Sequence, residues 1–247
     1  MQGIPPSGIQ AWRQLAPSSV AQWLSGIGTL IAVLIALFKD EWLRWRRRPK
    51  LSVTIKAESP NCLQVPTAVV FNPATGQQLW SGSMYWLRLW VENTGKGRAE
   101  QVQVFASKLY KEGANGKFAP IQNFEPMNLR WANPSDPIRP EIFAAGLSGG
   151  FGKHCDLLSV SDPANPTDAM PGYQGQCIGT LQLEVPPTAN RNRLPPGKYI
   201  VEARVGAANA KPVTVLVELN IKGGWSPDPT TMFTEFLGVR VVSSVGR

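Results

Sequence analysis

The pattern of hydrophobic positions divides the chain into one long apolar segment near its start and many short alternating runs after it. Residues 20–38, VAQWLSGIGTLIAVLIALF, contain no charged side chain, and Lys39 follows at once. Nineteen helical residues span about 28 Å, close to the ~30 Å hydrocarbon core of a bilayer. We therefore expect a short tail over residues 1–18 and a transmembrane helix with a basic extension over residues 19–48, since Pro49 disfavours helix before it.

The later runs have the period of β-strands. Residues 51–55, 85–92 and 213–221 alternate between apolar and polar side chains, as in strands with one buried face. Pro, Gly and Asn separate the runs, and only residues 228–237 suggest a helical turn. Without sustained βα alternation a doubly wound fold is disfavoured. The pattern predicts a mainly β protein in which an antiparallel sandwich of about nine strands occupies residues 51–247.

Two stretches of this region carry a resemblance to a known domain type. The hairpin LRLWVENTGKGRAEQVQVFA resembles the V-x-N-x-G…A-x-x-V-x-V hairpin of bacterial immunoglobulin-like (Ig-like), adhesion-related sandwiches of the CARDB type. LPPGKYIVEARVGAANAKPVTVLVELNI is similar to the closing strands of such domains. The whole plan also resembles uncharacterised bacterial single-pass membrane proteins that carry one such domain. The resemblance implies an Ig-like fold and a binding or scaffolding role, and it carries over no catalytic residue.

The positive charge is concentrated beside the apolar segment. The chain has a net charge of +8, and its first fifty residues hold seven basic and two acidic side chains, which leaves only +3 for the rest. We therefore expect no nucleic-acid partner. Arg13 is the only basic residue before the apolar segment, whereas six follow it within twelve residues. The positive-inside rule then predicts a bacterial inner-membrane protein with its amino terminus outside and its β domain in the cytoplasm.

The flanks of the segment carry residue types typical of a membrane interface. The expected interface residues are Trp23, Trp42, Trp45, Arg44, Arg46, Arg47 and Arg48. The arginines either only set topology or also attract anionic lipid. A cleaved signal peptide is the competing interpretation, but it would place positive charge before the apolar region and a small-residue cleavage site after it.

Small residues recur along one face of the predicted helix. Gly28, Ala32 and Ala36 are four positions apart, a spacing that lets transmembrane helices approach closely. The spacing is consistent with a homo-oligomer or a partner subunit packed on this face. It is equally consistent with chance, since small residues are common in such helices.

The three cysteines do not form a disulfide framework. Cys62, Cys155 and Cys177 are an odd number without close spacing, which suits a reducing compartment. A Cys155–Cys177 bridge stays open as an alternative if the domain is exported.

Candidate chemistry is sparse. Residues 146–150, GLSGG, satisfy G-x-S-x-G around Ser148, and His154 follows. A nucleophile elbow needs a strand–turn–helix context and a histidine much later in the chain. His154 and Cys155 are adjacent and would point to opposite faces of a strand, so they cannot easily share a metal ion. We expect no catalytic residue, metal or cofactor.

The aromatic side chains in the 85–92 run offer one further surface. Trp86, Arg88 and Trp90 share the face opposite the predicted core, and exposed aromatics beside arginine suit a protein interface. The alternative is that the irregular segment 118–145 covers this face. The leading hypothesis is a membrane-anchored, non-catalytic scaffolding subunit. An extracytoplasmic adhesion or ligand-binding module is the second, and a hydrolase based on Ser148 is a remote third.

Overall fold

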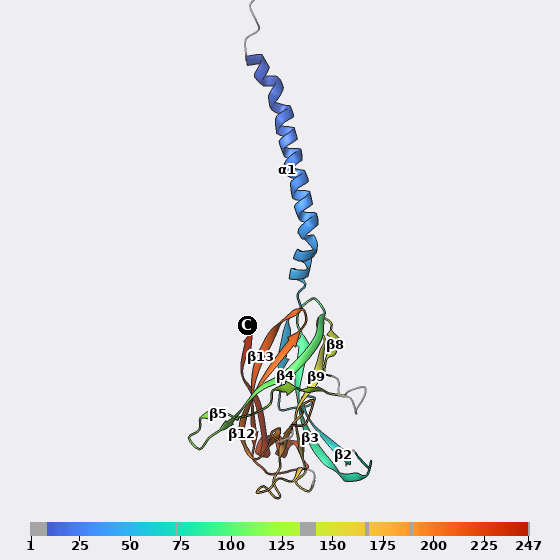
Figure 1. Cartoon of the computed structure of the whole chain (residues 1–247), viewed down its shortest axis with the longest axis vertical. Coiled ribbons are helices and arrows are strands. Elements are labelled where there is room, and N and C mark those ends of the chain that lie inside the picture. Colours follow the sequence, from blue (N-terminus) through green and yellow to red (C-terminus); the bar gives the residue numbers. More distant parts are fainter. Residues whose placement is uncertain (1–8, 73, 134–141, 166–167, 188–189, 247) are drawn as a thin grey trace, which may run out of the picture. The chain divides into compact units, whose positions relative to one another are not determined.

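The computed structural model describes residues 9–72, 74–133, 142–165, 168–187 and 190–246. The chain forms two compact units, Met1–Arg47 and Arg48–Arg247. The described residues of the first unit form one helix, and those of the second form a β-sandwich (Figure 1).

The helix is longer at its start than the sequence pattern predicts. Helix α1 runs over Ile9–Arg46, ten residues before the expected start and two short of the expected end. The polar stretch before the apolar segment is rich in Gln, Ala, Arg and Leu, which have high helix propensity, and the helix continues through Pro17. Within α1, Gln22–Leu43 is long and apolar enough to cross a bilayer, a property that membrane anchors and signal sequences share.

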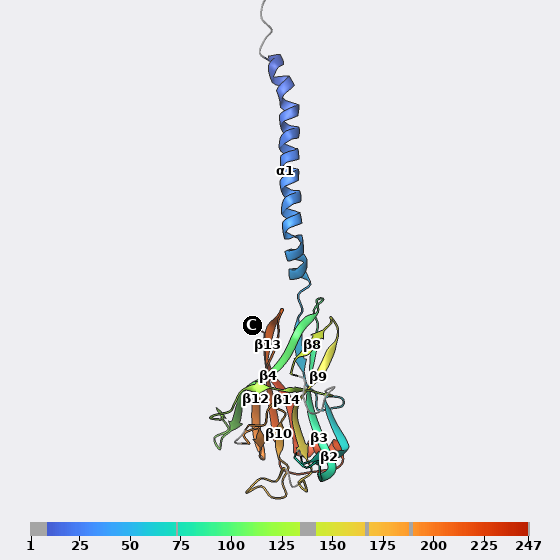
Figure 2. The same cartoon turned by 45° about the vertical axis from the view of Figure 1, so that its right-hand side comes forward.

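Two antiparallel sheets make up the second unit. The first sheet contains β1 (Leu51–Thr54), β2 (Cys62–Phe71), β3 (Gln78–Asn93), β7 (Arg130–Trp131), β9 (Gly152–Ser161), β10 (Gly179–Leu181) and β11 (Arg193–Leu194). The second contains β4 (Ala99–Glu112), β5 (Phe118–Pro120), β6 (Met127–Asn128), β8 (Ala144–Leu147), β12 (Gly197–Ala207), β13 (Ala210–Ile221) and β14 (Leu237–Gly246). In Figure 2, β12 and β13 lie on one side of the sandwich and β3 and β9 on the other.

The predicted fold class is confirmed, and the core lies between the sheets. Tyr85, Leu87, Leu89 and Val91 of β3 are fully buried, as their alternation predicts. The described residues form fourteen strands rather than about nine, because several short pairings carry no alternation that a sequence could show. The suggested turn at 228–237 is also present, as a short helical stretch that begins at α2 (Pro229–Thr231) and is capped by Asp228.

The irregular segment after β5 links the two sheets. Met127 and Asn128 of β6 pair with β4 in the second sheet, whereas β7, two residues later, pairs with β9 in the first. Leu129 and Trp131 are fully buried. The described part of the irregular segment 118–145 therefore contributes apolar side chains to the core between the sheets.

A candidate binding groove at the chain-entry end

A buried asparagine holds together the end of the sandwich at which the chain enters from α1. The side-chain nitrogen of Asn93 donates to the carbonyl oxygens of Gly97 (2.6 Å) and Leu147 (2.9 Å). Its side-chain oxygen accepts from the backbone N–H groups of Lys50 and Gly95, each at 3.0 Å. Asn93 is fully buried, so these four bonds satisfy its amide completely and tie three segments together. This gives a physical role to the asparagine of the V-x-N-x-G hairpin.

The entry segment, residues 48–50, lies directly on the turn that follows Asn93. A Cβ atom added to Gly95 would lie 2.6 Å from the carbonyl oxygen of Arg48, a distance that real side chains do not reach. The backbone N–H and the hydroxyl of Thr94 both donate to the carbonyl oxygen of Lys50, at 2.8 and 3.1 Å. The last basic residues before the first strand are therefore part of the sandwich.

The turn between β12 and β13 reaches the same end from the second sheet. The side chain of Asn209 donates to the carbonyl oxygen of Arg98 (2.9 Å) and accepts from the backbone N–H of Glu100 (3.0 Å). This fixes the start of β13 next to the start of β4. The chain-entry end thus combines residues 48–50 with the turns at 94–98 and 208–210.

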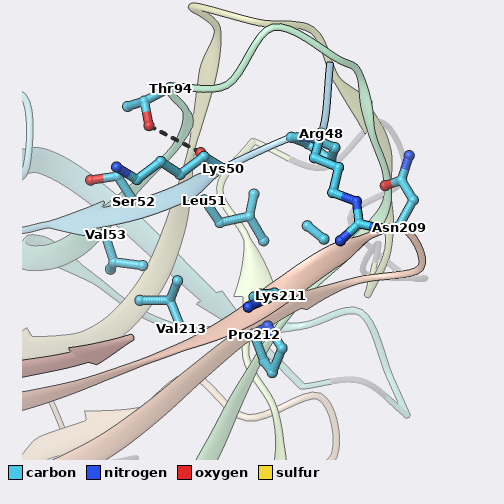
Figure 3. A pocket seen from close by; sticks show the side chains of 12 residues that line it. Arg48, Lys50, Leu51, Ser52, Val53, Thr94, Asn209, Lys211, Pro212 and Val213 are labelled. Carbon is cyan, nitrogen blue, oxygen red and sulfur yellow. Dashed lines mark hydrogen bonds between the residues drawn. The ribbon is translucent and has the colours of Figure 1, made fainter. Parts of the chain in front are cut away.

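Between these segments lies a groove of about 930 Å³. Residues 48–53 and Thr94 form one wall, and residues 209–213 form the other. Figure 3 shows the Arg48 side chain extending toward Asn209, and the side chain of Val53 lying close to that of Val213 of the other wall. The groove is therefore apolar at its base and polar at its mouth. Its volume lies in the range of ordinary ligand sites.

The charges at this groove are all of one sign. Arg48, Lys50 and Lys211 line it, no carboxylate does, and Lys96 and Arg98 lie in the adjoining turn. All five side chains are exposed, and none forms an ion pair within the described part of the chain. Elsewhere in the described sandwich some cations have a carboxylate within 4.0 Å (Lys56, Arg88, Lys108, Arg193, Lys198 and Arg240), whereas exposed Lys117 and Lys222 have none. The chain-entry end differs in that five unpaired cations lie close together there.

Strand β1 also presents an edge to the groove. It pairs with β3 and ends its sheet in the strand order. Leu51 lies opposite Asn93, whose own backbone N–H and C=O bond to Phe151 and Gly150 on the far side of β3. Such a pair is not hydrogen-bonded across the ladder, so the backbone N–H and C=O groups of Leu51 and Val53 point away from β3. They face the open side of the sheet.

The tryptophan face of β3, formed by Trp86, Arg88 and Trp90, lies outside the groove lining, and its side chains contact neighbouring residues of the same sheet. The Nε of Arg88 donates to Asp156 at 2.7 Å, and its guanidinium lies 5.8 Å from the ring centre of Trp86. Trp90 packs on His154 with ring centres 4.7 Å apart. Trp86, Arg88 and Trp90 are half-buried, and Leu129 and Trp131 fill the core instead of covering them. Partner binding at this face stays a prediction.

His154 sits in an unusual environment for a histidine. Its Nε2 atom is buried and has no hydrogen-bond partner in the described part of the chain. Burial lowers the pKa of the imidazole, and the nearby positive charge of Arg88 lowers it further. Both effects favour the neutral form of the imidazole in the folded domain.

The hydrolase motif lacks its expected context. Ser148 is exposed in the turn between β8 and β9, so both flanks are strands rather than a strand and a helix. His154 lies within β9 against Trp90. Among the described residues no group of three or more His, Cys, Asp or Glu side chains could hold a metal ion.

All three cysteines are free and buried, so the Cys155–Cys177 bridge that the sequence left open is not formed. Burial raises the pKa of the Cys62 and Cys177 thiols to about 12 and that of Cys155 well above its ordinary value. The thiol of Cys155 donates to the carbonyl oxygen of Arg130 at 3.3 Å.

The predicted helix-packing residues and most of the predicted membrane-interface residues lie along α1, whereas Arg47 and Arg48 follow its end and Arg48 lines the groove. Gly28, Ala32 and Ala36 are exposed on the helix, as are Trp23 and Trp42. The guanidinium of Arg46 lies 5.2 Å from the ring centre of Trp42, and Arg47 is also exposed. The side chains of Arg44 and Trp45 lie outside the described residues. Helix packing and lipid contact stay predictions.

The sequence reasoning missed the groove because its two walls are about 160 positions apart in the chain. The available signal was the presence of cations in two turns, NTGKGR and NAKP, which belong to different hairpins. Comparisons with protein-family models, with curated proteins and with solved structures give no match for this chain.

Proposed function

We propose that this chain is a membrane-anchored, non-catalytic binding protein, an accessory or scaffolding subunit that holds a partner beside a bacterial inner membrane. The observation that carries the proposal is the basic groove at the chain-entry end. Five exposed cations without an ion pair in the described part of the chain lie together at this end, with no carboxylate in the groove lining, and so produce a local positive field. Such a field suits recognition of an anionic partner.

The rigidity of the groove supports a binding role. Asn93 fixes the wall that begins at Lys50, and Asn209 fixes the opposite wall. A site held by buried or bonded amides loses little conformational freedom when it is occupied. The strand flanks of Ser148 give no support to hydrolysis.

Anchoring is the second part of the proposal. The apolar helix supplies the span, and the arginines that follow it favour a cytoplasmic β domain. Each of these cations attracts an anionic membrane surface by about 1 kcal/mol. The partner would then be held within a few residues of the bilayer surface.

In-cell photo-crosslinking tests the binding role. We would place a benzoylphenylalanine at Ser52, on the groove, and at Lys222, an exposed residue outside the groove lining, in the full chain. We expect a discrete crosslinked protein from position 52 and none from position 222. Absence of any adduct at position 52, together with a lone monomer after purification in mild detergent, would contradict the proposal.

A further inference from the structure

We infer that the groove binds an extended peptide segment rich in carboxylates, which adds a strand to the free edge of β1. This inference rests on the proposed binding function and names the chemistry of the partner. It follows from three features of the groove: its strand edge, its charge and its apolar base.

The strand edge calls for a partner with both donors and acceptors. The N–H and C=O groups of Leu51 and Val53 point away from β3, so the edge offers two donors and two acceptors. A lipid phosphodiester accepts hydrogen bonds but has no proton to donate, and an inorganic phosphate, although it carries P–OH groups, is too compact to bond donors and acceptors that are two residues apart along a strand. An extended peptide does both, in the alternating order of a β ladder. The edge therefore favours a peptide over a phosphate.

The charge of the groove selects the side chains of that peptide. Arg48 and Lys50 lie at one wall and Lys211 at the other, with no lining carboxylate. A basic peptide would be repelled from both walls, whereas glutamate or aspartate side chains would pair with cations that have no partner in the described chain. The groove therefore favours an acidic segment.

The apolar base of the groove determines which positions of the bound peptide are apolar. Leu51 and Val53 are buried, and Val213 lies on the opposite wall near Val53 (Figure 3). Side chains of an added strand alternate between the core side and the outer side. The four residues of β1 span about 13 Å, so they accommodate about four residues of a partner strand. A segment that alternates apolar and acidic residues fits both requirements.

Peptide binding to the full chain in detergent micelles tests the inference. The probe is fluorescein-labelled Glu-Val-Glu-Val-Glu-Val, followed by fluorescence anisotropy at low salt. We expect saturable binding that weakens as salt is added, and no binding of the Lys-Val counterpart. A fully N-methylated probe keeps the charge but loses its N–H donors, and we expect it to bind at least tenfold more weakly.

Charge-reversal variants locate the site. Lys211→Glu and Arg48→Glu should each weaken binding of the probe about tenfold, since each removes one contact and adds a repulsive one. Lys222→Glu changes the net charge equally and should leave the affinity within twofold of wild type. Near-UV circular dichroism of each variant confirms that the sandwich is folded.

Several outcomes would overturn the inference. Equal binding of the N-methylated probe would mean an anion site without strand addition. Equal binding by Lys211→Glu and Lys222→Glu would place the peptide outside the groove. Binding of phosphatidylglycerol in mixed micelles, with no binding of the peptide, would identify a lipid headgroup instead. In each of these cases a protein adduct at position 52 would still support the scaffolding function, so the two failures are distinguishable.

Discussion

Asn93 is the residue on which the chain-entry end depends most directly. Its amide makes four hydrogen bonds in a fully buried position. Asn93→Ala would leave two carbonyl oxygens and two N–H groups without their partner, so we expect the free energy of unfolding to fall by about 3 kcal/mol. Urea denaturation of the full chain in micelles measures this. As a control, Asn115→Ala removes one exposed turn hydrogen bond to Lys117 and should lower the free energy of unfolding by less than about 1 kcal/mol. Equal destabilisation by the two substitutions would contradict the stabilising role of Asn93.

His154 predicts how stability depends on pH. Its pKa is lowered in the folded domain by burial and by Arg88, so the unfolded chain binds a proton more readily. The contribution of His154 to the free energy of unfolding is fully present above the ordinary histidine pKa of about 6.5. It is lost as the pH falls from there toward the lowered pKa of the folded state. His154 is the only histidine in the chain. We expect urea stability to fall between pH 7.5 and 5.5, and His154→Gln to reduce that fall. An unchanged pH dependence in the variant would contradict this account.

The cysteines give a prediction about reactivity. Alkylation needs an accessible thiolate, but all three thiols are buried and burial raises the pKa of Cys62 and Cys177 to about 12. We expect no labelling by iodoacetamide in the native protein at pH 8 and labelling of three thiols after denaturation without reductant. Mass spectrometry counts the labels. If only one cysteine were labelled after denaturation, the other two would be joined in a disulfide bond.

At the level of elements, Gly95 determines how the entry segment meets the sandwich. Gly95→Ala would force the residue 48–50 segment away from the turn, because a Cβ there overlaps the backbone of Arg48 and Lys50. We expect faster tryptic cleavage after Lys50 and weaker binding at the groove. Gly206→Ala is the matched control, since its Cβ would meet no atom within 4 Å. Similar cleavage rates in the two variants would show that the segment is not held by this contact.

The individual strands and the helix differ in how well the sequence predicts them. Strand β3 was predictable because one face is buried along its length, which forces alternation from Tyr85 to Val91. Strands β6 and β7 were not, since each contains two residues and forms only through pairing with distant strands. The sequence pattern does not predict the helix start at Ile9 because the prediction follows a continuous apolar run, whereas a mixed stretch of Gln, Ala, Arg and Leu extends a helix through its high helix propensity.

The site was less predictable than the fold. The sequence marked Asn93 as part of a hairpin motif and Arg48 as part of a basic cluster, but it did not show that Lys211 lies across a groove from them. That proximity depends on how the two sheets pack against each other, and the hydrophobic periodicity of a single strand carries no information about it. The tryptophan face of β3 was identified from alternation, yet the ion pair of Arg88 with Asp156 required the register of β3 against β9.

On the scale of the whole molecule, the same basic residues enter both the proposed orientation and the proposed binding groove. Arg48 and Lys50 belong to the cation cluster after the apolar segment and also line the groove, so the charges that favour a cytoplasmic domain under the positive-inside rule would also bind the partner that we propose. We therefore expect a carboxyl-terminal GFP fusion to fluoresce and a carboxyl-terminal alkaline phosphatase fusion to stay inactive. Arg44→Glu combined with Arg46→Glu and Arg47→Glu reduces the topological signal without touching the groove lining, and should increase phosphatase activity. Active phosphatase in the unmodified fusion would place the domain outside the cytoplasm and favour an exported ligand-binding module instead.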